Sequence, residues 1–384
     1  MISFHGKEFS LPPQKPQGKG EIWEDKRINE SGKRRRTVTD AGARLGQEKG
    51  DEMAKYIIKR ILISLLILLG VSIFLYFLVR LMPVNYIRDQ YYLTHNQSAS
   101  SDEELDRFLE MYGLHDNSFG GIIKGYGTWL WGVLQGDFGK SFIDNQPVGQ
   151  KIFNNMGVSF AISFVSLILQ LIIAIPLGIK SACNQYGKLD YTVTVLTMIG
   201  MSFPTFFFGS IVIKIFAVDL GWFEVGGLHT ATLPKNATWW ESTVDLLWHM
   251  VLPMFVLVIL SIGSLMRYTR TNTLEVLNAD YIRTARAKGL SEKTVVYKHV
   301  FRNTLIPLVT TLAGTLPGLF GGAMITETMF DLPGIGSLAY TALTKGDIPF
   351  IMAYNMFLAV LTVLGVLLSD LMYAVVDPRV KLGK

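Results

Sequence analysis

The residues able to do acid–base, nucleophilic or metal chemistry are scattered along this chain of 384 residues. Its six histidines stand at positions 5, 95, 115, 229, 249 and 299, and no pair has the spacing of metal ligands. The sequence contains neither HExxH, which predicts a zinc protease, nor GxSxG, which predicts a serine hydrolase. Cys183 is the only cysteine, so it cannot form an internal disulfide, and a small near-surface residue is favoured over a nucleophile. These residues predict no catalytic site.

A single short stretch is reminiscent of a phosphate-binding loop. Gly139, Lys140 and Ser141 match the end of a P-loop, but that pattern requires a glycine five residues before Gly139, and Leu134 stands there. We therefore expect no nucleotide site, no bound metal and no cofactor in this chain.

Composition and charge-free segments place the chain in a membrane. Hydrophobic residues make up 49% of it, and the formal net charge is +5. Basic residues flank apolar segments instead of gathering on a soluble domain, which argues against nucleic-acid binding. About 20 residues of helix cross the hydrocarbon of a bilayer, and continuous apolar runs lack the alternation of barrel strands. The runs free of Asp, Glu, Lys and Arg predict an all-α polytopic membrane protein with six transmembrane helices, at 61–79, 157–179, 191–213, 246–266, 303–326 and 348–369.

The distribution of Lys and Arg predicts the orientation. If the N-terminus is inside, the inside segments hold 27 of these residues and the outside segments hold 7. This bias places both termini in the cytosol and the chain in the plasma or inner membrane. The predicted organisation is a disordered cytosolic extension (1–52), a first transmembrane helix (53–82), an external cap with interfacial helices (83–153), a transmembrane core (154–376) containing a cytosolic loop (267–302), and a cytosolic C-terminus (377–384). Within the cap, helical spacing predicts one apolar face, formed by Leu105, Phe108, Leu109 and Tyr112.

The cytosolic loop 267–302 is too long to be a simple connection. A turn of about 2 to 5 residues can join two antiparallel helices, so 36 residues must form structure of their own. Leu277, Tyr281 and Ala285 repeat every four residues and predict an apolar stripe. Arg283 and Arg286 fall off this stripe.

The same loop contains signals that end one helix and start another. Gly289 can adopt the left-handed conformation that ends a helix, and Ser291 can cap the next one, with Glu292 well placed against the helix dipole. The pattern predicts helix, glycine turn and helix in the cytosol. An amphipathic hairpin lying on the inner leaflet is the alternative from the residues alone.

The fifth apolar run contains small residues and ends in an acid. Gly314, Gly318 and Gly322 repeat every four residues, and Pro317 can kink the helix. Such a face predicts close helix packing, either between subunits or within the chain. Glu327 follows at the outer end and is predicted to be either a pathway acid or an interfacial carboxylate. Ion-coupled secondary transport would require ionisable side chains near the middle of the membrane. Glu327 and Lys214, the ionisable residues nearest the membrane core, both fall near the predicted outer face.

The stretch EVLNADYIRTARAKGLSEKTVVYKHVFRNTLIP resembles the coupling loop of ABC importer permeases, especially those of the oligopeptide and dipeptide branch. Five further motifs extend the resemblance over residues 53–384: KYIIKRILISLLILLGVSIFLYFLVRLMP, GDFGKSF, LLWHMVLP, ETMFDLPGIGSLAYTALTKGDIPF and DLMYAVVDPRV. It departs from the general importer pattern, since Arg283, Thr284 and Ala285 stand where that pattern has Glu-Ala-Ala. The resemblance implies a type I ABC importer permease fold and an ATPase-docking role for Asp280, Tyr281, Arg283, Ala285, Arg286, Ala287 and Gly289.

The resemblance also implies a function and partners. The chain is expected to form half of the pathway for peptides, beside a second homologous permease subunit in the lipid bilayer. An external solute-binding protein would deliver the cargo, and two separate ATPase subunits would hold ATP and Mg²⁺. A permease for nickel or another small solute is an alternative, because relatives with similar permeases carry such cargo.

Overall fold

The computed structural model describes residues 55–94, 99–114, 116, 118–234 and 237–376. The predicted disordered extension 1–52 and C-terminus 377–384 lie outside these residues. The chain divides into two units, Met1–Arg60 with Lys381–Lys384, and Ile61–Val380. Only residues 55–60 of the first unit are described, at the start of the helix Lys55–Arg80. All contacts reported below lie within the second unit.

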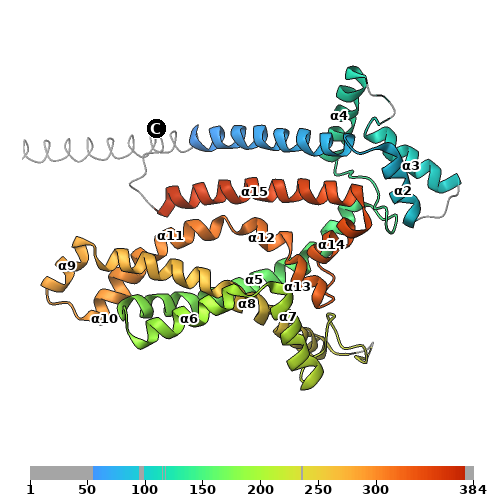
Figure 1. Ribbon diagram of the computed structural model, residues 1–384. Helices are drawn as coiled ribbons and strands as arrows, with labels where there is room; N and C mark the ends of the chain where they lie inside the picture. Colours follow the sequence, from blue (N-terminus) through green and yellow to red (C-terminus); the bar gives the residue numbers. More distant parts are fainter. Residues whose placement is uncertain (1–54, 95–98, 115, 117, 235–236, 377–384) are drawn as a thin grey trace, which may run out of the picture. The chain divides into compact units, whose positions relative to one another are not determined.

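The described residues form helices and no β-strand, which confirms the all-α prediction (Figure 1). The external segment contains α2 (Val84–Thr94), α3 (Ala99–Met111) and α4 (Phe119–Leu134). The middle of the chain forms α5 (Val148–Cys183), α6 (Lys188–Ser202), α7 (Thr205–Val212), the π-helix η1 (Ile213–Asp219) and α8 (Trp239–Leu277). The remainder forms α9 (Asp280–Ala287), α10 (Glu292–Thr294), the π-helix η2 (Val295–Val300), α11 (Phe301–Ala313), α12 (Leu316–Gly321), α13 (Met324–Met329), α14 (Ile335–Lys345) and α15 (Ile348–Val376).

Four of these helices are each long and apolar enough to cross a bilayer: Lys55–Arg80, α5, α8 and the part Ile348–Met372 of α15. The pair Lys188–Ser202 and Thr205–Asp219 would make a fifth span, but it is bent by 102°. Phe203 is extended before Pro204, since the residue preceding a proline disfavours helical backbone. The predicted span 191–213 is therefore broken at its middle.

The predicted span 303–326 is also not one helix, because its residues are divided among α11, α12 and α13. Helix α11 ends at Gly314, and α12 ends at Gly322, whose φ of +81° suits a residue without a side chain. The prediction of six continuous transmembrane helices is thus confirmed for four, while the other two segments are interrupted.

Helices α5 and α8 pack along one another, and α6 and α7 pack on α8. Helices α11 and α12 lie beside α15, as Figure 1 also shows, and α12 contacts α5. In the cap, Leu105, Phe108, Leu109 and Tyr112 are all buried, which confirms the predicted apolar face of α3. They share a core with residues of the first helix and of α15, so the cap is attached to the C-terminal part of the first helix and to the N-terminal part of α15.

Candidate functional site

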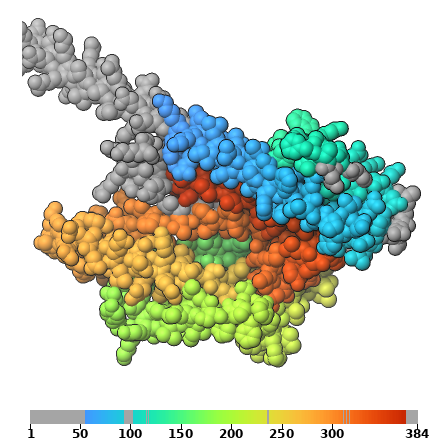
Figure 2. Space-filling model, turned by 45° about the horizontal axis from the view of Figure 1, so that its top comes forward, coloured from blue at the N-terminus to red at the C-terminus, as the bar shows by residue number. Residues whose placement is uncertain are grey.

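Residues 278–302, here named the coupling segment, begin where α8 ends. The side chain of Asn278 caps α8 by donating to the carbonyl of Leu274 (3.0 Å). Helix α9 begins at Asp280, after Asn278 and Ala279. The Asp280 carboxylate lies in the first turn of α9, where it interacts favourably with the helix dipole. The segment (gold to orange) lies on the surface in Figure 2. The predicted separate helix in this loop is confirmed.

The turn after α9 forms as the residue types predict. Gly289 has φ +77°, in the left-handed region, and its amide donates to the carbonyl of Arg286 (2.9 Å). Ser291 then accepts from the amide of Thr294 (3.4 Å) and caps α10. Helix α10 continues through η2 into α11, so the second helix of the motif leads directly back into the apolar core.

The inward face of α9 is formed by Ile282 and Ala285, which are 0% and 8% exposed. They pack against Val295 and Val300 of η2 in a small apolar cluster. Tyr281, by contrast, is 49% exposed. The predicted stripe is confirmed at Leu277, which packs against this cluster, and at Ala285, but it is wrong at Tyr281, because Ile282 takes the inward position. Ala285 also cannot present its side chain to a partner, because it faces the chain's own core.

The outward face of α9 is polar and aromatic. Its exposed residues include an aromatic ring and two guanidinium groups, which protein interfaces favour. Arg283 lies 3.7 Å from the carboxylate of Asp280, and Arg286 lies 2.8 Å from that of Glu292. The predicted docking residues on this face are Asp280, Tyr281, Arg283, Arg286 and Ala287, and Gly289 ends it.

A partly buried ion pair joins the N-terminal end of α6 to the C-terminal part of α8. Arg270 donates from Nε and Nη2 to the two oxygens of Asp190, at 2.7 and 2.8 Å. Asp190 also accepts from the Ser181 hydroxyl and from the Tyr186 amide (2.9 Å). Nearby, a Cβ atom on Gly178 would lie 2.8 Å from the Met266 carbonyl, so α5 and α8 approach closely here. These residues were not predicted, since 80 positions separate Asp190 from Arg270.

Glu327 is a buried helix cap. It is 1% exposed, and its carboxylate accepts from the amides of Gly336 (2.8 Å) and Ser337 (3.1 Å) in the first turn of α14. The Ala323 amide donates to its other oxygen (2.9 Å). The enclosed carboxylate caps α14 within the chain, and a pathway role for Glu327 stays a prediction.

The three glycines of the fifth apolar run do not share a helix face. Gly314 ends α11, Gly318 lies inside α12, and Gly322 follows α12. A Cβ atom on Gly322 would lie 2.6 Å from the Gly336 amide nitrogen, whereas one on Gly318 would meet no atom within 4 Å. Intrachain packing therefore explains Gly322, and the single packing face predicted for all three is wrong.

The stretch GDFGKSF is attached to the chain's own fold. The Asp347 carboxylate accepts from the Ser141 hydroxyl and from the Phe142 amide (3.0 Å). Lys151 donates to the same hydroxyl (3.2 Å) and pairs with Asp144 (2.7 Å). Ser141 of the Gly-Lys-Ser sequence is thus part of a buried polar contact at the N-terminal end of α5.

Comparison with known proteins agrees with this arrangement. Residues 174–382 match the family described as binding-protein-dependent transport system inner membrane component. The oligopeptide transport system permease protein AppB of Bacillus subtilis is 40% identical, over 86% of this chain and 100% of its own length. The dipeptide transport system permease protein DppB of Alkalihalophilus pseudofirmus is 31% identical, over 86% and 100%.

Among solved structures, a chain of an inward-facing MetNI methionine ABC transporter is 19% identical, with a TM-score of 0.45, and the match covers 59% of this chain and 97% of that one. This likeness is distant, so the assignment depends on the family match and the two permeases. The chain belongs to the family of binding-protein-dependent transport system inner membrane components.

Proposed function

We propose that this chain is one permease subunit of a type I ABC importer for peptides, paired with a second homologous permease. Family membership makes it a membrane component of a binding-protein-dependent transport system, and this argues against ion-coupled secondary transport. Relatives named for oligopeptide and dipeptide transport, each matched over its full length, favour peptides over nickel as the cargo. An external solute-binding protein delivers the peptide to the outer face.

The observation that carries this proposal is the construction of α9. The helix lies outside the apolar spans and attaches to them through Ile282 and Ala285. Its other face leaves Tyr281 and Arg283 free to contact a partner. A short helix held by an apolar inner face and exposing aromatic and guanidinium groups is suited to dock on a separate ATPase subunit. ATP and Mg²⁺ are held by that subunit.

The contacts of the coupling segment supply a route for movement. Closure of the two ATPases displaces α9, and the apolar cluster passes the displacement to η2 and hence to α11. The segment is also continuous with α8, which Arg270 ties to Asp190 of α6. Several helices are therefore displaced together, and the pathway changes between outward and inward access.

The orientation follows from charge. The excess of Lys and Arg in the segments assigned to the inside supports a cytosolic position for α9, on the side where the ATPases meet ATP. The cap of α2–α4 then faces outward.

Reconstituted transport tests this function. Proteoliposomes holding both permeases and both ATPases are loaded with ATP, and the solute-binding protein is added outside with a labelled tripeptide or with Ni²⁺. We expect the tripeptide to accumulate only with ATP and the binding protein. Accumulation of Ni²⁺ but not of peptides, or uptake that follows an ion gradient without ATP, contradicts the proposal.

A further inference from the structure

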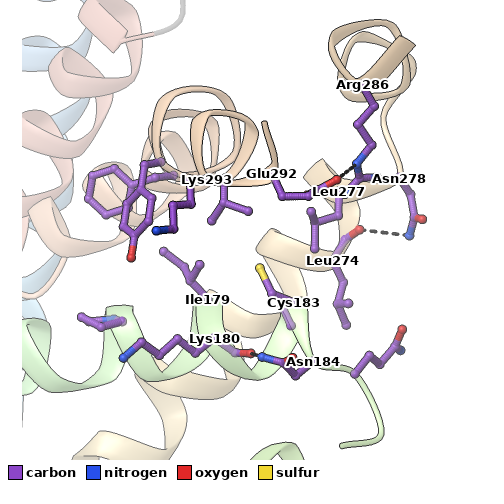
Figure 3. Close-up of a pocket in the computed structure, with 16 residues that line it drawn as sticks. Ile179, Lys180, Cys183, Asn184, Leu274, Leu277, Asn278, Arg286, Glu292 and Lys293 are labelled. Carbon is purple, nitrogen blue, oxygen red and sulfur yellow. Dashed lines mark hydrogen bonds and ion pairs between the residues drawn. The ribbon is translucent and has the colours of Figure 1, made fainter. Parts of the chain in front are cut away.

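A pocket of about 850 Å³ opens between the inner end of α5, the last turns of α8 and the coupling segment (Figure 3). Residues from these elements form its walls, including Pro176, Ile179, Lys180, Lys293 and Phe301. The function proposed above uses the outer face of α9; Arg286 of that face also lines the pocket, but the proposal makes no use of the other walls.

The pocket extends from apolar to polar surroundings. Pro176 and Ile179 belong to the charge-free run 157–179, and Lys180 is the first charged residue after it. Phe301 adds an aromatic ring at the start of α11. One end of the pocket therefore lies at the edge of the hydrocarbon layer, and the other reaches the headgroup layer on the inner side.

The charge of the pocket is unbalanced. Glu292 is the only carboxylate residue among its described walls, and it is already paired with Arg286 (2.8 Å). Neither Lys180 nor Lys293 has a side-chain hydrogen bond or ion pair with another described residue. Figure 3 shows the two lysines on opposite sides of the pocket, reaching toward the same end of it. Two ammonium groups thus face a space with no acidic partner for them.

We propose that this pocket binds the headgroup of an acidic phospholipid from the inner leaflet. The phosphate lies between Lys180 and Lys293, and the glycerol and first acyl carbons contact Pro176, Ile179 and Phe301. Basic pockets between transmembrane helices on the cytosolic side suit such headgroups. The apolar wall favours a lipid over free phosphate, because an inorganic anion would leave that wall without a partner.

A lipid in this pocket would connect two parts of the chain, and the importance of that connection for transport rests on the proposed function. Lys180 belongs to α5 and Lys293 to the coupling segment, so a bound headgroup holds these two elements together. Lipid binding itself requires neither ATP nor cargo. Failure of the lipid site would therefore leave the transport proposal intact, and failure of transport would leave lipid binding measurable.

The test is a lipid titration of the full-length permease, purified with its partner subunits and stripped of lipid. Native mass spectrometry follows binding of phosphatidylglycerol, with phosphatidylcholine and inorganic phosphate as separate probes. The double variant Lys180→Gln/Lys293→Gln is compared with Lys188→Gln/Lys298→Gln, which removes the same charge from exposed lysines outside the pocket. Each pocket lysine is expected to contribute about 5-fold, so the first variant should bind phosphatidylglycerol roughly 25-fold more weakly.

The control variant should bind phosphatidylglycerol as the unaltered permease does, and phosphatidylcholine should bind weakly to all three. Equal phosphatidylglycerol affinity in the two double variants overturns the proposal. Competition by inorganic phosphate at a similar concentration also overturns it, because that result shows a free-anion site. Binding to the permease pair that disappears when the ATPases are present would show that an ATPase covers the pocket, and that result too contradicts a lipid site.

Discussion

Arg286 and Glu292 form an ion pair across the turn at Gly289, with Nε 2.8 Å from Oε1. The pair ties the last turn of α9 to the first turn of α10. Both side chains are substantially exposed, so the pair contributes little to overall stability. It links the two helices across the turn, while the buried Ile282 attaches α9 to the apolar cluster.

Replacing Gly289 should weaken coupling without preventing membrane insertion. In Gly289→Val a β-branched residue must adopt φ +77°, which costs about 1–2 kcal/mol, so α9 should leave its position part of the time. The amount of ATPase that co-purifies with the permease should fall several-fold at equal membrane abundance. Gly221→Val is the matched control, because Gly221 has φ +61° in open space on the predicted outer side. Equal loss in both variants would show that strain alone is responsible.

Breaking the Arg270–Asp190 pair should destabilise the contact between the N-terminal end of α6 and the C-terminal part of α8. Arg270→Gln leaves the buried Asp190 carboxylate without its partner, which should cost about 3 kcal/mol. We expect the apparent Tm of the purified permease to fall by roughly 5–10 °C. Arg267→Gln, on the exposed side of the same helix, should change Tm little. A similar Tm for the two variants would contradict the structural role of the pair.

Cys183 reports the orientation. It is exposed at the C-terminal end of α5, which the charge distribution predicts to be cytosolic, so a membrane-impermeant thiol reagent should label it only after the cells are permeabilised. The control is Lys124→Cys in a Cys183→Ser background, because Lys124 is exposed on the cap helix α4 and should be labelled in intact cells. The reverse pattern of labelling would place the coupling segment outside.

The contact of Asp347 with Ser141 and Phe142 should make the stability of the permease depend on pH. Burial raises the pKa of this carboxyl, and the donors Ser141 and Phe142 oppose the rise only in part. The folded chain therefore binds this proton more tightly than the unfolded chain. The contribution of Asp347 to the free energy of unfolding is greatest below the ordinary pKa of an aspartate, about 4, and it falls as pH rises through the raised pKa.

The variant Asp347→Asn should lack that dependence. Measured from pH 4 to 8, the Tm of the unaltered permease should decline relative to this variant over the lower part of the range and then run parallel to it. Asp89→Asn removes an exposed carboxylate of α2 and should follow the unaltered permease. A constant Tm difference between Asp347→Asn and the unaltered permease would exclude titration of Asp347 in this range.

Local signals predicted the coupling segment well. Gly289 ends α9 and Ser291 caps α10 because these conformations depend on the residues themselves and their nearest neighbours. The inward face of α9 was predicted less well, since Tyr281 and Ile282 are both apolar enough to be buried. Contact with Val295 and Val300 decides between them, and a single helix pattern does not contain that information.

Long-range contacts could not be predicted in this way. Ser141 and Asp347 are 206 positions apart, and each looks like an ordinary surface residue in its own segment. Glu327 was predicted to lie at an outer helix end, but the sequence could not show that its three amide donors come from Ala323 before α13 and from Gly336 and Ser337 in α14. The breaks at Pro204 and Gly322 also interrupted segments whose composition alone predicted continuous helices.

The most direct test of the account is the affinity of the ATPase subunits for the permease pair in nanodiscs. Tyr281→Ala/Arg283→Ala removes an aromatic ring and a guanidinium from the exposed face of α9, and Tyr191→Ala/Arg302→Ala removes the same groups from exposed positions on α6 and α11. If α9 docks on an ATPase, the first variant should raise Kd about 30-fold, a loss of about 2 kcal/mol, and the second should change it little. An unchanged Kd for Tyr281→Ala/Arg283→Ala, or an equal loss in both variants, would contradict the proposal that this helix couples the permease to ATP hydrolysis.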